Sequence, residues 1–436
     1  MAPFFINGMK LDELYKRFLE STGVTTDTRK IVKGNLFFAL SGENFDGNAF
    51  AEVAINKGCS YVIVDKKEYA KDEKFILVDD CLKSLQSLAI HHRNNLAVPF
   101  IGITGTNGKT TTKELISKVL STEFQILSTE GNLNNHIGVP LTILKVTKQT
   151  EIAIIEMGAN HPGEIEFLCN IAKPTHGIIT NIGKAHLEGF GGFEGVKKTK
   201  NELYKYLVQN DGIAFVNYDN EILKSLLGNM LVQKVFYGNS EFSLIRGTIL
   251  NSNPYLEFEV PEKGIVKTKL AGRYNLENAL AAVCIGTYFA VPFEKIRFAL
   301  ESYEPSNQRS QMKQTSNNML LMDFYNANPS SMEVALENFD KMDHPKKAVI
   351  LGDMLELGED AETEHKKILD QVLSMKLDKV ILVGNIFCNL SYPDNVLCFQ
   401  DSKASQNWII QNKLEGYLIL VKGSRGIKLE SVAEVL

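Results

Sequence analysis

The stretch GITGTNGKTTTKE, residues 102–114, decides how the centre of this chain folds. Small and apolar residues lead into a turn that contains two glycines, and a helix-like run that begins with Lys109 follows. A strand, a glycine turn and a helix place free backbone N–H groups and the positive helix end where an anion can sit. The strict pattern G-x-x-x-x-G-K-[ST] is not met, because Ile103 stands at its first glycine.

We therefore interpret the stretch as a phosphate cradle for ATP or GTP, in which the glycines allow close approach of the backbone and the lysine reaches the β- and γ-phosphates. A plain β-turn-α connection without a ligand is the alternative. The residues expected to surround the phosphates are Gly105, Thr106, Asn107, Gly108, Lys109, Thr110 and Thr111.

Composition excludes several classes of protein. The 436 residues are 44% hydrophobic and 23% charged, with a formal net charge of −5, so the chain has no basic field for nucleic acid. No apolar run approaches the roughly 20 residues of a membrane span, and the N-terminal residues lack the apolar core and cleavage site of a signal peptide. Six cysteines without a CxxC pair predict reduced, mostly buried thiols and a cytoplasmic location.

Strand-like and helix-like segments alternate along the chain. The strand-like runs are nearly continuously apolar, as parallel strands covered on both faces require, so we predict an α/β fold. NNLAVPF and the polar stretch 303–311 read as connectors, which predicts three domains at 1–97, 98–305 and 306–436. Within the second domain we expect one helix near 194–208, a more β-like insert at about 233–270 and a helix that starts at Asn275.

Two candidate groups follow other strands of the second domain. In an open α/β sheet, ligands collect at the carboxyl ends of strands. Glu156 ends the strand-like run EIAIIE, where an acid would hold Mg²⁺, although an ordinary strand-end carboxylate is the alternative. His186 follows HGIITNI and is a candidate for a metal role or an ordinary loop histidine, since imidazole is not a favoured ligand of Mg²⁺.

Lys200 lies on an apolar stripe. In the helix-like run EGVKKTKNELYKYL, helical spacing places Lys200 on one face with Val196, Leu203 and Leu207. Burial of a lysine lowers its pKa, so the amine could be neutral and reactive. The alternative is that only its stem is buried and the ammonium reaches solvent.

Two polar segments remain. Asn275 and Asn278 lie one turn apart at the start of a helix-like run, where they could read a nucleobase edge, although Asn275 could equally be an N-cap. The segment DFYNANPSSM, 323–332, is a polar loop between a strand and a helix, or an ordinary connection of that kind.

Eight motifs together resemble the Mur ligase family, in which they occur in this order. They are ITGTNGKTTTKE, IIEMGANHPGEI, KAHLEGFG, KTKNELY, GRYNLENALAA, DFYNANPSSM, LGDMLELGE and VKGSRG, and residues 26–58 are similar to the family's N-terminal module. The resemblance implies a three-domain architecture: a UDP-sugar-binding domain, a central P-loop ATPase domain with a parallel sheet, and a C-terminal Rossmann-like domain. It also implies a monomeric, ATP-dependent amide ligase of peptidoglycan synthesis.

The versions YNANP and GANHPGEI look like those of members that add D-Ala-D-Ala to UDP-MurNAc-tripeptide. In such members the tripeptide carboxylate takes the γ-phosphate to form an acyl phosphate, and the dipeptide amine then displaces phosphate. The alternatives are a sibling ligase that adds a single amino acid, such as the third residue of the peptide or a folate glutamate, and a catalytically silent nucleotide-binding scaffold.

The resemblance also implies roles for particular residues. Two Mg²⁺ sites would use Thr110, Glu156, His186 and Lys200, with Lys200 carbamylated by CO₂. The residues expected in catalysis are Lys109, Lys200, His186 and Arg309. Asn275 and Asn278 would contact adenine, Arg309 the γ-phosphate and Asp323 the ribose. The residues expected to bind the UDP-sugar-peptide are Thr28, Arg29, Ser41, Asn132, Asn134 and Asn135. Those expected near the incoming dipeptide are Tyr325, Asn326, Asn328, Ser424 and Arg425. The chain departs from the family pattern at Met322 and Phe324, beside Asp323.

Overall fold

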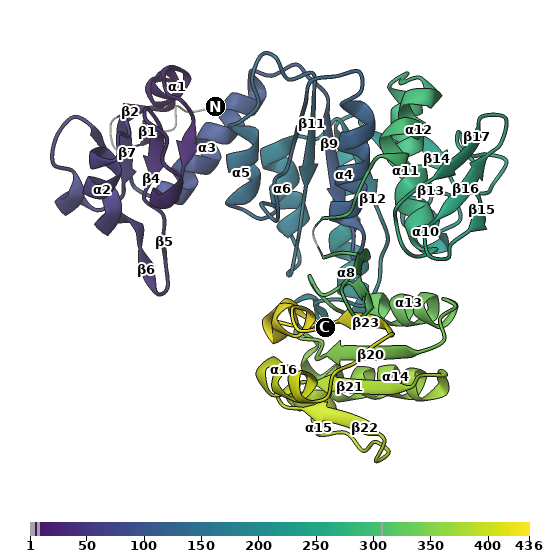
Figure 1. The fold of residues 1–436 in the computed structure, drawn as a ribbon. Coiled ribbons are helices and arrows are strands. Elements are labelled where there is room, and N and C mark those ends of the chain that lie inside the picture. The colour runs from purple at the N-terminus through teal and green to yellow at the C-terminus, as the bar shows by residue number, and fades with distance from the viewer. Residues whose placement is uncertain (1–4, 7–8, 307) are drawn as a thin grey trace.

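The computed structural model describes residues 5–6, 9–306 and 308–436, and these form three α/β units (Figure 1). Asn307, within the expected connector 303–311, lies outside the described residues. In Figure 1 the first unit lies at the left, the second fills the upper centre and right, and the third lies below it. The expected α/β fold is therefore confirmed, while the domain limits stay predictions.

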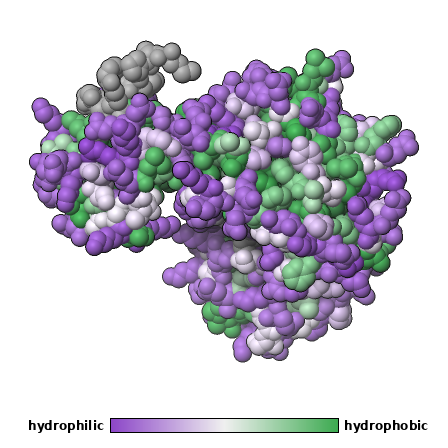
Figure 2. Space-filling view, turned by 90° about the horizontal axis from the view of Figure 1, so that it is seen from above, coloured by the Kyte–Doolittle hydropathy of each residue, from purple (hydrophilic) through white to green (hydrophobic). Residues whose placement is uncertain are grey.

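The first unit is built on a small parallel sheet. Its strand order is β3 (Val24–Thr25), β4 (Leu36–Phe38), β7 (Tyr61–Val64) and β8 (Phe75–Leu77). The helices are α1 (Leu11–Glu20), α2 (Ala51–Asn56) and α3 (Cys81–Asn94), and short pairs of strands form β1 (Phe5–Ile6) with β2 (Met9–Lys10) and β5 (Ser41–Gly42) with β6 (Phe45–Asp46). Helix α3 packs on α5 (Gly138–Ile143) and α6 (Glu164–Ala172) of the second unit. Figure 2 shows the first unit as a separate lobe beside the main body.

The second unit has a six-stranded, wholly parallel sheet. Its order is β10 (Ile126–Ser128), β11 (Ile152–Glu156), β9 (Phe100–Thr104), β12 (His176–Ile179), β13 (Ile213–Asn217) and β14 (Gln233–Tyr237). The side chains of β9 contribute to two hydrophobic cores, one on each face of the sheet. Phe100 belongs to one core, and Ile101 and Ile103 belong to the other. Burial on both faces explains why these strands read as continuous apolar runs.

Helices cover both faces of this sheet. On one face lie α4 (Lys109–Leu120), α11 (Asn275–Tyr288) and α12 (Phe293–Glu301); on the other lie α5, α6 and α9 (Glu202–Gln209). Helix α4 starts directly at the carboxyl end of β9, the central strand, so the glycine turn sits where ligands bind in open α/β sheets. The remaining helices are α7 (Leu187–Phe190), α8 (Phe193–Lys200) and α10 (Glu221–Leu227).

Two expectations for this unit need correction. The single helix expected near 194–208 is divided into α8 and α9, which are separated at Asn201 although that residue keeps αR backbone angles. The predicted stripe continues across this break, since Val196, Lys200, Leu203 and Leu207 are all buried. The β-like insert is also divided: β14 joins the parallel sheet, and only β15 (Thr248–Asn251), β16 (Glu257–Val260) and β17 (Gly264–Lys267) form an antiparallel sheet of their own.

The third unit has a six-stranded sheet with one antiparallel edge strand. The order is β18 (Gln311–Gln314), β19 (Met319–Met322), β23 (Leu418–Lys422), β20 (Lys347–Gly352), β21 (Lys379–Val383) and β22 (Val396–Phe399), with β18 antiparallel to β19. Its helices are α13 (Pro329–Asp340), α14 (Ala361–Ser374), α15 (Asn385–Cys388), α16 (Ser402–Gln411) and α17 (Glu430–Ala433). An open, mostly parallel sheet with cores on both faces is the Rossmann-like architecture that the resemblance implies for this unit.

The expectation of uniformly reduced thiols is wrong. Cys388, at the end of α15, and Cys398, in β22, form a disulfide with their Cα atoms 5.6 Å apart. Pairing of these elements in space, which a spacing of ten residues does not reveal, brings the two sulfurs together. The other four cysteines, Cys59, Cys81, Cys169 and Cys284, are free and buried.

Among the described residues, no helix combines the length and the apolar character needed to cross a bilayer.

Candidate functional site

A cleft of about 690 Å³ lies at the carboxyl ends of the central strands, between the second and third units. It brings together most of the residues singled out from the sequence. Those that line it are Gly105, Thr106, Asn107, Gly108, Lys109, Thr110, Thr111, Asn132, Asn134, Asn135, Glu156, His186, Lys200, Asn275, Asn278, Arg309, Asp323, Tyr325, Asn326 and Asn328. Thr28, Arg29, Ser41, Ser424 and Arg425 do not line it.

The glycine turn has a shape that only glycine accommodates. Gly105 and Gly108 have φ values of +142° and +76°. A Cβ on Gly105 would lie 2.0 Å from Thr180 Oγ1, and one on Gly108 would lie 2.6 Å from Asn278 Oδ1. The turn is fixed from the next strand, because the Thr106 N–H donates to the Asn181 carbonyl at 2.9 Å. The sequence thus specifies a rigid concave backbone at the start of α4.

Lys109 is the half-buried cation of this turn. Its Nζ donates to the carbonyls of Gly105 and Thr106 at 2.8 and 2.9 Å. Its pKa is lowered to about 8, mainly by burial and also by the charge of Arg309, while the charge of Glu156 acts in the opposite direction. The cleft therefore holds a lysine whose charge an incoming phosphate would stabilise.

Glu156 ends β11 deep beside the turn and is 1% exposed. Its Oε1 accepts a hydrogen bond from Asn134 Nδ2 at 2.8 Å, while its buried Oε2 has no hydrogen-bond partner among the described residues. A buried carboxylate oxygen that accepts no hydrogen bond, beside a phosphate turn, fits a hard cation such as Mg²⁺. Thr110, in the first turn of α4, adds a hydroxyl at the same cleft.

Lys113 is a site residue that our sequence reasoning missed. It lies on the buried face of α4, 3% exposed, and its Nζ donates to the Thr129 carbonyl at 2.7 Å. The same Nζ is 3.7 Å from Glu156 Oε2. Lys113 shares its helix face with Ile116 and Leu120. A lysine at an apolar helical position is the sequence signal by which Lys200 was selected. Lys113 carries the same signal and could have been selected in the same way.

Lys200 is 3% exposed at the end of α8, which confirms its predicted burial. Within the described part of the chain its ammonium makes no hydrogen bond or ion pair, and its Nζ lies 5.5 Å from the centroid of the Phe190 ring. Burial lowers its pKa well below the usual value, and the charge of Lys109 adds to the effect. The cleft therefore contains a lysine disposed to be a neutral amine.

His186 lies at the head of the short helix α7 with a left-handed φ of +50°. Its side chain is 28% exposed, and its Nδ1 is in contact with a carboxylate oxygen of Glu356 from the third unit. Burial lowers the pKa of the imidazole, while Glu356 opposes that shift.

Two buried amides join α11 to α4 behind the turn. Asn278 Oδ1 accepts from the Thr112 hydroxyl at 2.9 Å, and Asn278 Nδ2 donates to Asn275 Oδ1 at 2.9 Å. Asn275 Nδ2 in turn donates to the Ala271 carbonyl at 2.7 Å. Asn275 is not a side-chain N-cap of α11, which has none. Both amides line the cleft, so their predicted contact with adenine stays a prediction.

Arg309 and Asp323 face the cleft from the connector and from the end of β19. Arg309 stacks over the Tyr325 ring at 3.8 Å, and its buried Nε has no partner among the described residues. Asp323 accepts from Lys422 Nζ at 2.6 Å, which sequence reasoning did not identify. Met322 and Phe324 are both buried in the hydrophobic core of the third unit. Asp323, which lies between them, faces away from that core and lines the cleft.

The side-chain amide of Asn328, from the third unit, contacts the glycine turn of the second unit. Asn328 caps α13 with its side-chain oxygen, which accepts from the Ser331 N–H at 2.9 Å, and its Nδ2 donates to Asn107 Oδ1 at 2.8 Å. Ser424 lies behind the cleft, 3% exposed, and Arg425 lies 5.4 Å from the Tyr325 ring.

The predicted residues of the first unit remain on their own lobe. Arg29 is 86% exposed and pairs with Asp27 at 2.8 Å, next to Thr28 in the short helix Thr28–Lys30. Ser41 donates to Asp46 Oδ1 at 3.0 Å across the β5–β6 pair. A ligand in contact with these residues and with the cleft would have to be long, or the lobe would have to move.

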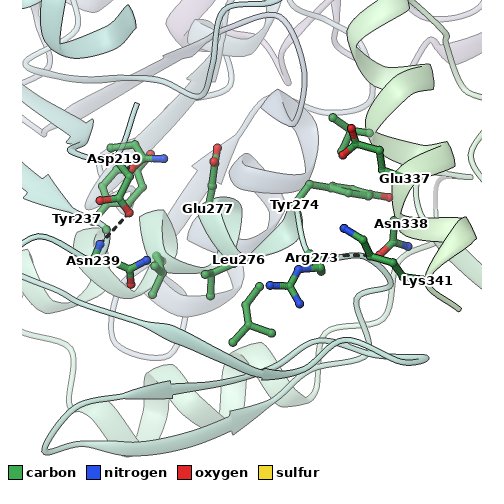
Figure 3. A pocket seen from close by; sticks show the side chains of 15 residues that line it. Asp219, Tyr237, Asn239, Arg273, Tyr274, Leu276, Glu277, Glu337, Asn338 and Lys341 are labelled. Atoms are coloured by element: carbon green, nitrogen blue, oxygen red, sulfur yellow. Dashed lines mark hydrogen bonds between the residues drawn. The ribbon is translucent and has the colours of Figure 1, made fainter. Parts of the chain in front are cut away.

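A smaller hollow of about 340 Å³ adjoins the cleft on the other side of Tyr274 and Glu277 (Figure 3). Figure 3 shows Asp219 and Asn239 on one side and Glu337, Asn338 and Lys341 on the other. The Arg273 N–H donates to Asn338 Oδ1 at 3.3 Å and closes the second unit against α13. Val334 lines both spaces, so α13 forms a wall common to them.

Comparison with known proteins gives a consistent family assignment for all three units. The family descriptions that match are the Mur ligase family, catalytic domain, at residues 20–98, the Mur ligase middle domain at 103–286, and the Mur ligase, glutamate ligase domain, at 308–425. Two relatives share the name UDP-N-acetylmuramoyl-tripeptide–D-alanyl-D-alanine ligase. The one from Bacillus subtilis (strain 168) is 36% identical over 95% of this chain and 93% of its own length, and the one from Escherichia coli (strain K12) is 34% identical over 95% and 93%.

Solved structures agree with this assignment. A crystal structure of MurF from Acinetobacter baumannii superposes with a TM-score of 0.86 at 29% identity and covers 98% of both chains. The MurF ligase from Thermotoga maritima in complex with ADP superposes with a TM-score of 0.82 at 27% identity, over 96% of this chain and 97% of that one.

Proposed function

This chain belongs to the Mur ligase family, with its three-domain architecture, and we propose that it joins D-Ala-D-Ala to UDP-N-acetylmuramoyl-tripeptide with consumption of ATP, in peptidoglycan synthesis. The observation that carries the proposal is the convergence in one cleft of a phosphate turn, a buried carboxylate oxygen that accepts no hydrogen bond and a buried unpaired lysine. These three groups serve phosphoryl transfer to a carboxylate better than they serve a nucleotide-binding scaffold.

The proposed reaction has two steps. An oxygen of the tripeptide carboxylate attacks the γ-phosphorus of ATP, the bond to the β–γ bridging oxygen breaks, and ADP leaves an acyl phosphate behind. The amine of D-Ala-D-Ala then attacks the acyl carbon, loses a proton, and phosphate departs. Catalysis of this kind depends mainly on positioning and on neutralising charge. Lys109 and the N–H groups of the glycine turn would hold the phosphates, and Arg309, with its free Nε, would face the transferred group.

Mg²⁺, when bound, would neutralise phosphate charge and align the phosphoryl group. Thr110 and Glu156 are the residues that would hold one ion, and His186 and Lys200 would contribute to a second. For Lys200 we propose carbamylation: the neutral amine adds CO₂ and releases a proton, which turns an unpaired buried nitrogen into a carboxylate. Oxygen donors of this kind are the ligands that Mg²⁺ prefers.

The substrates would be held at three places. Asn275, Asn278 and Asp323 would contact the nucleoside of ATP. Residues of the first lobe would hold the UDP-sugar end of the other substrate, with Asn132, Asn134 and Asn135 nearer the reaction. The loop of Tyr325, Asn326 and Asn328, with Ser424 and Arg425 behind it, would shape the dipeptide site. A monomer in the cytoplasm is the form we propose for the enzyme.

The deciding experiment is mass spectrometry of the product. Purified protein is incubated with ATP, Mg²⁺ and UDP-MurNAc-tripeptide that ends in lysine or in diaminopimelate, and D-Ala-D-Ala is compared with single amino acids. We expect an amide product only with D-Ala-D-Ala, together with ADP and phosphate. Turnover only with single amino acids would indicate a sibling ligase, and ATP binding without any amide product would indicate a scaffold.

A further inference from the structure

The motif LGDMLELGE, residues 351–359, carries no role in the reaction described above. It leaves β20 in the third unit and is held rigidly at its start. Asp353 is 3% exposed and accepts the N–H groups of Ile386 and Phe387 at 2.9 and 3.0 Å. The fully buried His365 accepts the Met354 N–H at 2.9 Å, and Ser424 Oγ accepts the Leu355 N–H at 3.0 Å. These bonds fix the direction in which the next residues project.

The projecting part of the loop turns through two left-handed residues. Glu356 has a φ of +64°, and Gly358 has a φ of +57°. A left-handed conformation costs a residue with a side chain about 1–2 kcal/mol, so a glutamate held there calls for a functional explanation. The loop packs on α7 of the second unit, where a Cβ on Gly358 would lie 3.2 Å from Glu188 Cβ.

Glu356 contacts His186, whose backbone also has a left-handed conformation. Glu356 Oε2 is in contact with His186 Nδ1 across the boundary between the two units. His186 Nδ1 is buried and makes no hydrogen bond among the described residues, so this exposed carboxylate is the group in contact with it. Neighbouring contacts hold the same segment: Lys184 Nζ lies 2.8 Å from Glu364, and the Lys184 N–H donates to Ser330 Oγ at 2.8 Å.

The orientation of the ring follows from this contact. His186 Nδ1 is buried, whereas the side chain as a whole is 28% exposed and lines the cleft. The accessible part of the ring is therefore the side away from Nδ1, where Nε2 lies. A histidine that binds a metal through one ring nitrogen normally donates the other N–H to a carboxylate or carbonyl, which fixes the tautomer and the ring orientation.

We propose that Glu356 is a positioning residue for His186. When the third unit is docked, its carboxylate holds the imidazole as the Nδ1–H tautomer and presents the lone pair of Nε2 to the cleft. The site for a second divalent cation is then complete only when the two units are closed on each other. This inference rests on the proposed function for the cation, but it does not depend on which amino acid or dipeptide the enzyme uses.

The first test reads the tautomer directly. Ring ¹⁵N shifts of His186, assigned by their loss in His186→Gln, are recorded for the whole protein with ADP and in three variants. Glu356→Ala removes the carboxylate, and Glu356→Gln keeps an acceptor oxygen. Glu359→Ala removes an exposed acid of the same loop that makes no hydrogen bond or ion pair among the described residues. We expect Nδ1–H in wild type, Glu356→Gln and Glu359→Ala, and loss of that preference in Glu356→Ala. An unchanged ring in Glu356→Ala overturns the proposal.

The second test measures cation affinity with Mn²⁺ as the probe, by electron paramagnetic resonance in the presence of ADP. Loss of the partner of a metal-binding histidine typically weakens binding 10- to 100-fold, so we expect a loss of about that size for the weaker site in Glu356→Ala. Glu359→Ala should bind as wild type does. Equal affinities in Glu356→Ala and Glu359→Ala, or a wild type with only one Mn²⁺ site, would overturn the proposal. Failure to ligate D-Ala-D-Ala would refute the proposed substrate and leave this result standing.

Discussion

Lys113 Nζ lies 3.7 Å from Glu156 Oε2, and both side chains are buried directly behind the phosphate turn. The lysine also donates to the Thr129 carbonyl, so it ties α4 to the ends of β10 and β11. A positive charge is thus built into the protein beside the acid that we expect to hold Mg²⁺. The pair keeps that acid in place before any cation arrives.

Lys113→Met should destabilise the central unit strongly. It leaves the Glu156 carboxylate buried without its cation, and breaking a buried pair from one side typically costs about 3–5 kcal/mol. Hydrogen exchange of amides in α4 and β11 would measure the loss where it occurs, since a chain of three units need not unfold in one step. Lys118→Met, on the exposed side of the same helix, should change exchange by less than about 0.5 kcal/mol. Equal effects of the two changes would contradict the assignment.

Lys200→Ala should lower kcat by about 100-fold or more, because the proposed carbamate would be lost from the charge-stabilising groups of the cleft. A small carboxylic acid added to the assay should restore part of the rate by occupying the space of the missing side chain. Lys198→Ala removes an exposed lysine of the same helix and should keep full activity. Full activity of Lys200→Ala without additive would rule out the role.

The affinity for ADP should fall as pH rises through about 8. In the free protein Lys109 has a pKa of about 8, and phosphate oxygens beside it would raise that value in the complex. Above pH 8 the complex therefore holds a proton that the free protein has lost, and binding must take one up, with at most a tenfold loss of affinity per pH unit. Calorimetry in buffers of different ionisation enthalpy would count this proton. Lys109→Met should bind more weakly and without the pH slope; an unchanged slope would exclude Lys109 as its source.

Thiol titration should distinguish the paired cysteines from the free ones. Protein unfolded without reductant should show four thiols, and protein reduced beforehand should show all six. Cys388→Ser should free Cys398 and raise the count without reductant from four to five. A count of three would mean that Cys398 had bonded to one of the other cysteines. Six thiols in unreduced wild-type protein would contradict the pairing.

The sequence predicted the local features well because each had a physical signature of its own. Continuous apolar runs marked the buried parallel strands, and Lys200 stood out because a lysine on an apolar stripe is anomalous. The break at Asn201 was not predicted, because this residue keeps αR backbone angles and no glycine or proline marks the position. The role of β14 was missed because this strand is only partly buried, so it lacks the continuous apolar run that marks the other strands of the parallel sheet, and it was grouped with the β-like insert.

The relations between distant residues could not be predicted. The contact of His186 with Glu356, the bond of Asp323 with Lys422 and the disulfide each join segments whose proximity depends on how units and strands pack. Periodicity within one segment carries no information about such pairs. A separate first unit was predicted, but its position relative to the cleft was not, and so Arg29 and Ser41 were not expected to lie outside the cleft lining.

The order of the central sheet has a mechanical consequence. Because β9 lies between β11 and β12, the strands that lead to the turn, to Glu156 and to the His186 segment are immediate neighbours. The three groups are thus anchored on adjacent hydrogen-bonded strands, and an error in pairing there would displace all of them at once. The first and third units can therefore change their positions while the turn, Glu156 and the His186 segment keep a fixed arrangement relative to one another.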